Sequence, residues 1–482
     1  MSMDRREFLR GTAWMGAAAA LAGCSATRFG FGQGGLMQNY ALKPMKRVRV
    51  GFVGVGGRGT GAVHRVSMIP GVDIVALCDS RGEQVEKNLD WLREKKYAGV
   101  DRIRKYVGDE AYKDLCDFGE CDVVYCATPW ALHQPVAMRA LLGGKIPLVE
   151  VTSALTVDEC WELVETSESL RIPCMQLENC VYGEIELLEL NLARMGMFGE
   201  ITHVEGSYIH DLRKIIPQSG PNNNEWRWRY GENMAHRGDR YPTHGLVPLC
   251  QTLGINRGDR LDYLVALGNG PTNKNYERVR REYLPDSDSR KFDPPAAMAD
   301  MNTTLIRSVN GVSILVQHDV SSPRPYDRKA FISGTKGVMG DYPFRCTFEE
   351  NCLDGRTHKW FDEKAAAEIR TKYVHPLWRD VSAMAKKVGG HGGMDFIMDL
   401  RWAWCLQNGE PLDMDVYDLA ATSCLCELTE TSDRNGSKPQ SVPDFTRGNW
   451  RNVKPWGVVN VDLRKMGLDR GEVKRDDAQL NV

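Results

Sequence analysis

The chain has 482 residues, of which 42% are hydrophobic and 26% charged, values typical of a soluble globular protein with two to three domains. They exclude a disordered chain, a collagen-like fibre and a multispan membrane protein. The 62 Lys and Arg residues nearly balance 64 Asp and Glu residues, so no nucleic-acid partner is expected. The 14 cysteines are scattered and lack the spacing of a metal site, so we expect no metal and mostly buried thiols.

Residues 1–24 have the features of an export signal. Arg5-Arg6 is typical of a twin-arginine signal, and the apolar run Trp14–Ala22 has the length of a signal core but is too short to span a bilayer. The sequence ending at Cys24 resembles a lipobox, in which Cys24 would be lipidated. The alternative is an ordinary cleavage site beside an incidental cysteine. We expect export by the twin-arginine route, to the periplasm or to a membrane-anchored lipoprotein, followed by a flexible linker over residues 25–45.

Residues 46–178 alternate short apolar runs with amphipathic stretches. One of these stretches begins with a capping box, Thr156 followed by Glu159. The apolar runs are Val48–Val55, Val72–Cys78, Val123–Ala127, Ile146–Val151 and Ile172–Leu177. Continuous apolar strands separated by helices predict an α/β fold, with a doubly wound parallel sheet of the Rossmann type.

Residues 179–435 predict a second, α+β domain. Its expected strands are Gly199–Tyr208, Leu261–Leu267, Thr303–Val309, Val312–Val316 and Ala330–Gly334. Asn310-Gly311 indicates a tight hairpin, so an open, largely antiparallel sheet is expected.

The rest of this domain is predicted as one long loop and two helices. Ser219–Arg240, rich in Asn, Trp and Arg, is predicted to be a long functional loop. The helices Met394–Gln407 and Val416–Thr431 are expected to pack back onto the first domain, and residues 436–482 form a C-terminal tail.

A glycine-rich motif follows the first predicted strand. It reads Gly54-Val55-Gly56-Gly57-Arg58-Gly59, which matches G-x-G-x-x-G. Such glycines allow a tight turn and bring backbone N–H groups close to a pyrophosphate at a helix N-terminus. Asp79 ends the next strand, 20 residues after Gly59, where an acid binds ribose hydroxyls and disfavours a 2′-phosphate. The pair predicts a dinucleotide site that prefers NAD to NADP.

Two further strand ends belong to the same predicted site. The segment Trp130-Ala131-Leu132-His133 follows one strand, and Glu150 ends another, so both border the crevice at the carboxyl edge of the sheet. The alternative for His133 is a residue that caps a helix start. The alternative for Glu150 is a solvated strand end.

These motifs together resemble the Gfo/Idh/MocA oxidoreductases, from about Lys46 to about Asn435. Dehydrogenases of that family usually carry Glu-Lys-Pro where this chain has Glu150-Val151-Thr152, and the missing lysine argues against simple dehydrogenation. Four later segments resemble glycoside hydrolase family 109 more specifically. They are Leu177–Tyr182, Gly206–Leu212, Tyr241–Leu246 and Ile255–Arg260.

The resemblance implies an NAD-dependent, retaining α-N-acetylgalactosaminidase acting on glycans with a terminal α-N-acetylgalactosamine. It implies transient oxidation of sugar C3 by bound NAD, deprotonation at C2, elimination, water addition and re-reduction. The residues implied to contact NAD are Arg58, Gly59, Asp79, Trp130, Ala131, Leu132, His133, Glu150, Val151 and Asn179. Those implied to line the sugar pocket are Tyr208, Arg229, Tyr241, Pro242, Thr243, His244 and Tyr326.

The implied route needs a base for the C2 proton. His244 is the first choice because histidine titrates near neutral pH; the alternative is a core histidine. Tyr182 is the second choice, and its alternative is a buried tyrosine with a bonded hydroxyl. Arg229, with Trp226 and Trp228, offers a donor and stacking faces for a sugar, or else packs on a neighbouring subunit.

Two other functions stay open at this point. One is an NAD-dependent sugar or cyclitol dehydrogenase, and the other is a non-catalytic sugar-binding lipoprotein. A homo-oligomer is also expected, because open-sheet faces in the Gfo/Idh/MocA family often associate.

Overall fold

The computed structural model describes residues 35–213, 215–216, 224–270, 272–349 and 359–468, and for 224–226 the backbone alone. The predicted export signal, with Cys24, and the first part of the predicted linker lie outside the described residues. No helix within the described ranges is long and apolar enough to cross a membrane.

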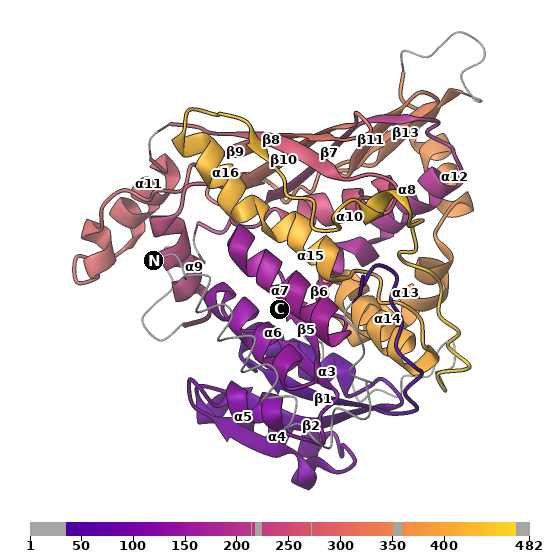
Figure 1. The fold of residues 1–482 in the computed structure, drawn as a ribbon. Coiled ribbons are helices and arrows are strands. Elements are labelled where there is room, and N and C mark those ends of the chain that lie inside the picture. Colours follow the sequence, from indigo (N-terminus) through magenta and orange to yellow (C-terminus); the bar gives the residue numbers. More distant parts are fainter. Residues whose placement is uncertain (1–34, 214, 217–223, 271, 350–358, 469–482) are drawn as a thin grey trace.

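The first domain contains a parallel sheet of six strands in the order β3-β2-β1-β4-β5-β6 (Figure 1). The strands are β1 (Val48–Val53), β2 (Val72–Asp79), β3 (Arg104–Val107), β4 (Val123–Cys126), β5 (Ile146–Glu150) and β6 (Met175–Leu177). Every residue of β4, β5 and β6 is buried, as expected for parallel strands covered on both faces. The predicted doubly wound sheet is confirmed.

Helices cover this sheet between the strands. They are α3 (Gly57–Val66), α4 (Gly82–Glu94), α5 (Tyr112–Asp117), α6 (His133–Leu142) and α7 (Val157–Leu170). The capping box at the start of α7 is confirmed, since Thr156 accepts the N–H of Glu159 and the Glu159 carboxylate accepts the N–H of Thr156. Strand β3 is missing from the sequence prediction because it is a short, mostly exposed edge strand with Arg and Lys in place of an apolar run.

The second domain contains a sheet of eight strands in the order β13-β12-β11-β7-β10-β9-β8-β14. The strands are β7 (Ile201–Ile209), β8 (Leu261–Gly268), β9 (Asn302–Ser308), β10 (Ser313–Asp319), β11 (Phe331–Gly334), β12 (Gly337–Gly340), β13 (Arg345–Phe348) and β14 (Gln440–Ser441). Only the β7–β10 pairing is parallel. The predicted open, largely antiparallel sheet and the β9–β10 hairpin at Asn310-Gly311 are therefore confirmed.

Helices of the second domain lie between this sheet and the first domain (Figure 1). They include α8 (Glu184–Arg194), α10 (Thr243–Leu253), α15 (Val416–Ser423) and α16 (Leu425–Arg434). Helix α10 packs on β7 and α15 packs on α7, while α14 (Met394–Asn408) packs on α3. The predicted helix Val416–Thr431 is thus two helices. The other helices are α9 (Asn224–Ala235), α11 (Lys274–Tyr283), α12 (Glu363–Lys372) and α13 (Pro376–Val388).

The prediction of one long loop over Ser219–Arg240 is wrong for the centre of this range, where α9 forms. Its Asn-rich sequence has low helix propensity, but burial of Tyr230 and Asn233 stabilises the helix through tertiary contacts. The Tyr230 hydroxyl donates to Asp293 at 2.8 Å, and Asn233 donates to the hydroxyl of Tyr276 at 2.8 Å.

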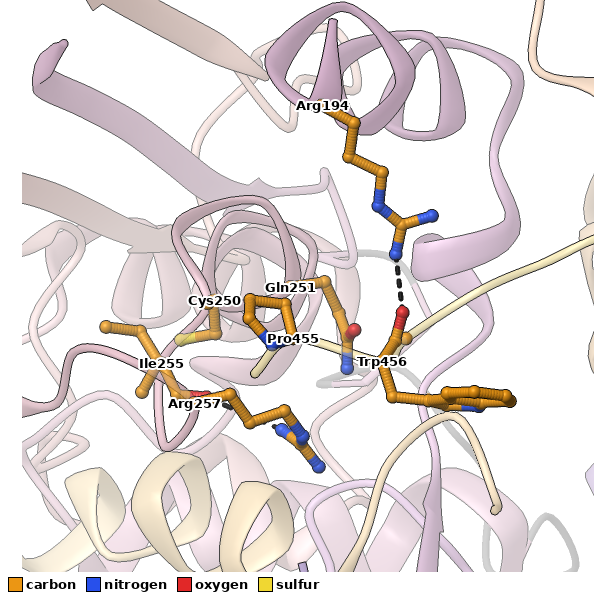
Figure 2. A pocket seen from close by; sticks show the side chains of 9 residues that line it. Arg194, Cys250, Gln251, Ile255, Arg257, Pro455 and Trp456 are labelled. Carbon is orange, nitrogen blue, oxygen red and sulfur yellow. Dashed lines mark hydrogen bonds between the residues drawn. The ribbon is translucent and has the colours of Figure 1, made fainter. Parts of the chain in front are cut away.

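Segments at both ends of the described chain pack on the two domains. The sequence predicts a flexible linker over residues 25–45, but Met37 is buried and its N–H donates to the Tyr417 hydroxyl at 3.1 Å. Near the other end, Arg194 at the end of α8 donates to the carbonyl oxygen of Trp456 at 2.7 Å (Figure 2). The small pocket in Figure 2, between α8, the end of α10 and this segment, contains none of the predicted site residues in its lining.

Candidate functional site

The glycine-rich loop lies between β1 and α3, at the carboxyl edge of the first sheet. Gly54 has a φ of +83°, which favours glycine. A Cβ on Gly59 would lie 1.8 Å from the carbonyl oxygen of Gly54, so the turn closes only with glycine there. At Gly56 an added Cβ would meet only the end of the Arg81 side chain, at 3.4 Å. This tight turn, with open space beside Gly56, fits the pyrophosphate of a dinucleotide.

Asp79 is buried at the end of β2 and contacts the same loop. Its Oδ2 accepts the N–H of Val55 at 2.9 Å, and its Oδ1 accepts the N–H of Arg81 at 3.0 Å. Each carboxylate oxygen keeps a second lone pair, so the group can accept ribose hydroxyls while it orders the loop. This placement fits the ribose role predicted for Asp79.

The segment after β4 approaches the same edge. The Trp130 indole donates to the carbonyl oxygen of Val151 at 3.2 Å, while Ala131 and Leu132 are exposed. The buried His133 ring lies between two backbone carbonyl oxygens, with Nδ1 2.7 Å from Thr152 and Nε2 2.7 Å from Thr128. Burial lowers the pKa of His133 although both carbonyls raise it. These polar contacts of His133 join the loops after β4 and β5.

Arg58, Glu150 and Asn179 converge beside the glycine-rich loop. Arg58 Nε donates to Glu150 Oε1 at 2.7 Å, and Arg58 Nη1 donates to Asp395 Oδ2 at 2.7 Å. Asn179 donates to the other oxygen of Asp395, also at 2.7 Å. Asp395 lies in the first turn of α14, so the second domain completes this part of the site.

A cluster of aromatic rings, here called the aromatic cluster, lies where the two domains meet. Tyr241 is stacked on Trp130 with ring centres 5.5 Å apart, and Tyr208 lies 4.8 Å from Tyr241. The Arg229 guanidinium lies 4.8 Å from the centre of the Trp130 ring. The members are Trp130, Tyr208, Trp228, Tyr241, His244 and Tyr326.

The phenol groups of the cluster stay protonated at neutral pH. Burial raises the pKa of Tyr208, and that of Tyr241 lies well above its usual value for the same reason, although Arg229 lowers both. A protonated hydroxyl can donate a hydrogen bond. The hydroxyl oxygen of Tyr208 also lies 3.1 Å from His210 Nδ1.

His244 lies in the first turn of α10 and is bonded to a fully buried carboxylate. Its Nδ1 lies 2.9 Å from Glu178 Oε2, while its Nε2 lies 3.4 Å from the Tyr241 hydroxyl. Burial raises the pKa of Glu178, but His244, the N–H of Cys180 and Thr243 outweigh it and leave that pKa below its usual value. The tautomer of His244 with a proton on Nδ1 can donate it to the carboxylate of Glu178, and Nε2 then has a free lone pair.

The other residues predicted to line the sugar pocket surround the Glu178–His244 pair. Pro242 occupies the N-cap position of α10 without a side-chain hydrogen bond, and Thr243 is the first residue of the helix. The Tyr326 ring lies 6.3 Å from Tyr208, and its hydroxyl accepts a hydrogen bond from Arg328 at 3.2 Å. The side chain of Trp226 lies outside the described part of the chain.

Tyr182 has different neighbours. Its hydroxyl donates to Asp413 at 2.9 Å, and Asp413 also accepts two hydrogen bonds from Arg401. Burial, followed by the charge of Asp413, raises the pKa of Tyr182 well above its usual value. The side chain is fully buried in the main core, so this geometry matches the bonded core tyrosine, and a role as base stays a prediction.

One group of three side chains in the described ranges has the composition and spacing of a metal site. Glu178, Cys180 and His244 each place a ligand atom within 4.8 Å of the others. In this structure Glu178 and His244 are joined by a hydrogen bond.

Comparisons with known proteins agree with this arrangement. Residues 48–176 match the model described as "Oxidoreductase family, NAD-binding Rossmann fold", and residues 182–452 match "Glycosyl hydrolase 109, C-terminal domain". A glycosyl hydrolase family 109 protein from Bacteroides thetaiotaomicron is 45% identical over 429 residues, 85% of this chain and 87% of that protein. Another, from Shewanella sp. strain MR-4, is 42% identical over 95% of this chain and 99% of that protein.

The chain belongs to glycosyl hydrolase family 109.

Solved structures show the same fold at low sequence identity. Levoglucosan dehydrogenase in complex with NADH has a TM-score of 0.61 and 16% identity, covering 82% of this chain and 99% of that one. An NAD binding oxidoreductase from Klebsiella pneumoniae has a TM-score of 0.62 and 16% identity, covering 83% and 100%. The predicted family, the Gfo/Idh/MocA fold and NAD as the cofactor are confirmed: the protein is a glycosidase of family 109 with an NAD-binding Rossmann domain.

Several residues of the site are absent from the sequence prediction. Glu178 and His210 lie within the segments that resemble family 109, and Asp395 lies within the predicted helix Met394–Gln407, but no role is predicted from the sequence for any of them or for His391. A signal for Asp395 is present in the sequence, because glycines at 389, 390, 392 and 393 surround His391 just before the predicted helix at Met394. Such a cluster indicates a tight backbone approach before a helix. Nothing in the sequence indicates that this turn meets the loop around Arg58, more than 330 residues earlier.

Proposed function

We propose that this family 109 glycosidase hydrolyses terminal α-N-acetylgalactosamine with retention of configuration at C1. The observation that carries the proposal is the Glu178–His244 pair, which puts an imidazole oriented by a carboxylate inside the aromatic cluster and beside the residues expected to hold NAD. The aromatic rings offer apolar faces and hydroxyl donors, which suit a neutral amino sugar. Ordinary glycosidases use two carboxylates across the scissile bond, but NAD-dependent ones are exceptions.

The proposed reaction combines the chemistry of NAD with that of the side chains around it. NAD, held at the glycine-rich loop and Asp79, would supply a reversible hydride acceptor for sugar C3; the C3 hydroxyl proton would pass to solvent, and the ketone would make the neighbouring C2 proton acidic. His244 Nε2 removes a proton at C2, and Glu178 stabilises the resulting imidazolium through Nδ1. The phenols of Tyr208 and Tyr241 are protonated, so they can hold a leaving or attacking oxygen by donating hydrogen bonds.

An aryl α-N-acetylgalactosaminide tests the proposal directly. We expect release of the aglycone without accumulation of NADH, and retention at C1 followed by NMR. Stoichiometric NADH without aglycone release would identify the dehydrogenase instead. Purified protein without NAD, and without gain of activity on adding it, would favour the sugar-binding lipoprotein.

The identity of the base has its own test. We expect His244→Ala to lose exchange of the C2 proton with solvent deuterium. Exchange at the wild-type rate in that variant would move the role to Tyr182, which Tyr182→Phe would then test.

We further propose that the protein is exported by the twin-arginine route and anchored through a lipid on Cys24. The sequence of residues 1–24 supports this location. Labelling of cells with a fatty-acid probe should mark the wild-type protein and not Cys24→Ser. Label in neither protein would indicate an ordinary, soluble periplasmic form.

We also propose a homo-oligomer formed through the outer face of the second sheet. Leu267 on β8 and Leu305 on β9 are more than half exposed on that face, and Tyr263 lies beside them. Light scattering should give a mass of at least two chains. The variant Leu267→Glu with Leu305→Glu should give the mass of one chain, and an unchanged mass would place the interface elsewhere.

A further inference from the structure

Asp395 of the second domain is hydrogen-bonded to Arg58 and Asn179, and through Arg58 it is linked to Glu150. Its Oδ2 accepts a hydrogen bond from Arg58, and its Oδ1 accepts one from Asn179, both at 2.7 Å. The Arg58 guanidinium simultaneously binds Glu150 at 2.7 Å through Nε. Arg58, Glu150 and Asn179 are expected to contact the dinucleotide. The Asp395 carboxylate is hydrogen-bonded to two of these side chains and is not itself expected to contact NAD.

The position of Asp395 is fixed by the turn before α14. A Cβ on Gly390 would lie 2.7 Å from the Cβ of Asp395, so the turn packs directly against this side chain. His391 in the same turn lies 2.9 Å from Asp395 Oδ2 through its Nδ1. Helix α14 itself packs on α3, the helix that begins with the glycine-rich loop. The carboxylate therefore has little freedom to move.

The charges around Asp395 keep it ionised. Burial alone would raise its pKa, but Arg58, Arg65 and His391 hold the pKa of Asp395 well below its usual value. Arg65 lies 3.6 Å away and is bonded mainly to Asp399. Removal of the Asp395 charge would leave two largely buried guanidinium groups with less compensation, and Arg58 free to turn away from the loop.

We propose that Asp395 is a positioning residue for NAD, so that retention of the cofactor by the first domain depends on a carboxylate of the second. Two of the guanidinium nitrogens of Arg58 are held between Glu150 and Asp395, which fixes the group beside the expected pyrophosphate. The inference concerns NAD retention and is independent of the reaction that the enzyme catalyses.

Asp395→Asn in the full-length holoenzyme tests it. We expect NAD to dissociate about 10-fold faster or more, as when one partner of a buried charge pair is removed. The matched control is Asp380→Asn on α13, whose carboxylate pairs with the exposed Arg379, and it should release NAD at the wild-type rate. An unchanged release rate in Asp395→Asn would overturn the proposal.

A purely structural role for Asp395 predicts a different pattern of ligand affinities. Because Arg58 lies at the glycine-rich loop, Asp395→Asn should weaken NAD and ADP-ribose alike but leave adenosine, which lacks the pyrophosphate, within about two-fold. An equal loss for all three ligands would indicate general loosening of the domain and would contradict the positioning role.

Hydrogen exchange on the wild-type protein covers the case in which the variant does not fold. If Asp395 couples the two domains to the cofactor, NAD should slow amide exchange in residues 390–396 as well as in residues 54–59. Exchange that slows in the loop alone would overturn the proposal. Neither measurement uses a glycoside, so a failure here is distinguishable from a failure of the proposed glycosidase specificity.

Discussion

Replacement of Glu178 by Gln tests the chemistry of the site with the smallest change in shape. Glu178 is fully buried and its carboxylate lies 2.8–2.9 Å from His244 Nδ1, so its charge acts on the imidazole and cannot reach the sugar directly. A hydrogen bond to a charged group is worth about 1.5–3 kcal/mol. If that energy is gained as the imidazole takes up a proton, its loss lowers kcat by about 10-fold to 150-fold.

The assay is steady-state hydrolysis of an aryl α-N-acetylgalactosaminide, with NAD content measured on the same samples. We expect Glu178→Gln to reduce kcat and the rate of C2 proton exchange together, with KM within about three-fold of wild type, since binding contacts are unchanged. Glu165→Gln, at a half-exposed position on α7, is the control and should retain full activity. A folded, NAD-loaded Glu178→Gln with kcat within two-fold of wild type would refute the reasoning.

Three further variants test other parts of the structure. Asp79→Ala removes the acceptor for the N–H groups of Val55 and Arg81. It should weaken NAD binding about 10-fold to 100-fold, measured by fluorescence titration, and reduce the discrimination against NADP. Unchanged affinity would contradict the ribose role. Gly59→Ala, whose Cβ would overlap the Gly54 carbonyl oxygen, should be purified without NAD, and wild-type NAD content would show that the turn adapts. Burial would raise the pKa of Glu430, but hydrogen bonds from His236 and Arg434 lower it to about 2, so its ionised form stabilises the fold above about pH 4.5 and this stabilisation is lost as the pH falls toward 2. The urea midpoint should therefore drop less between pH 6 and pH 3 in Glu430→Gln than in wild type, and equal drops would contradict this assignment.

The fold was largely predictable because most of its strands correspond to patterns within a short stretch of sequence. Buried parallel strands such as β4 and β5 are continuous apolar runs, and Asn310-Gly311 specifies a hairpin through two residues alone. The two elements that were not predicted, β3 and α9, lack such a local pattern. Strand β3 is polar because it is an edge, and α9 depends on distant partners of Tyr230 and Asn233.

Some residues of the site were likewise predictable from local sequence, and others were not. Gly54, Gly59 and Asp79 form a motif of fixed spacing, so a role in dinucleotide binding is predicted for them from the sequence alone. Asp395 acts through Arg58, and Tyr182 is bonded to Asp413 across 231 residues. Such contacts join segments far apart in the sequence and are set by tertiary packing, so short-range sequence patterns carry no information about them.

The burial of the cysteines has a chemical consequence. The twelve described cysteines are free thiols and all are buried, and burial raises the pKa of thiols such as Cys78 to about 12 and Cys126 to about 11. Thiolates, the reactive species, are therefore scarce in the native protein at neutral pH. A thiol reagent such as Ellman's reagent would modify these positions only when the surrounding structure opens, so the rate and extent of labelling would report local and global opening without any engineered probe.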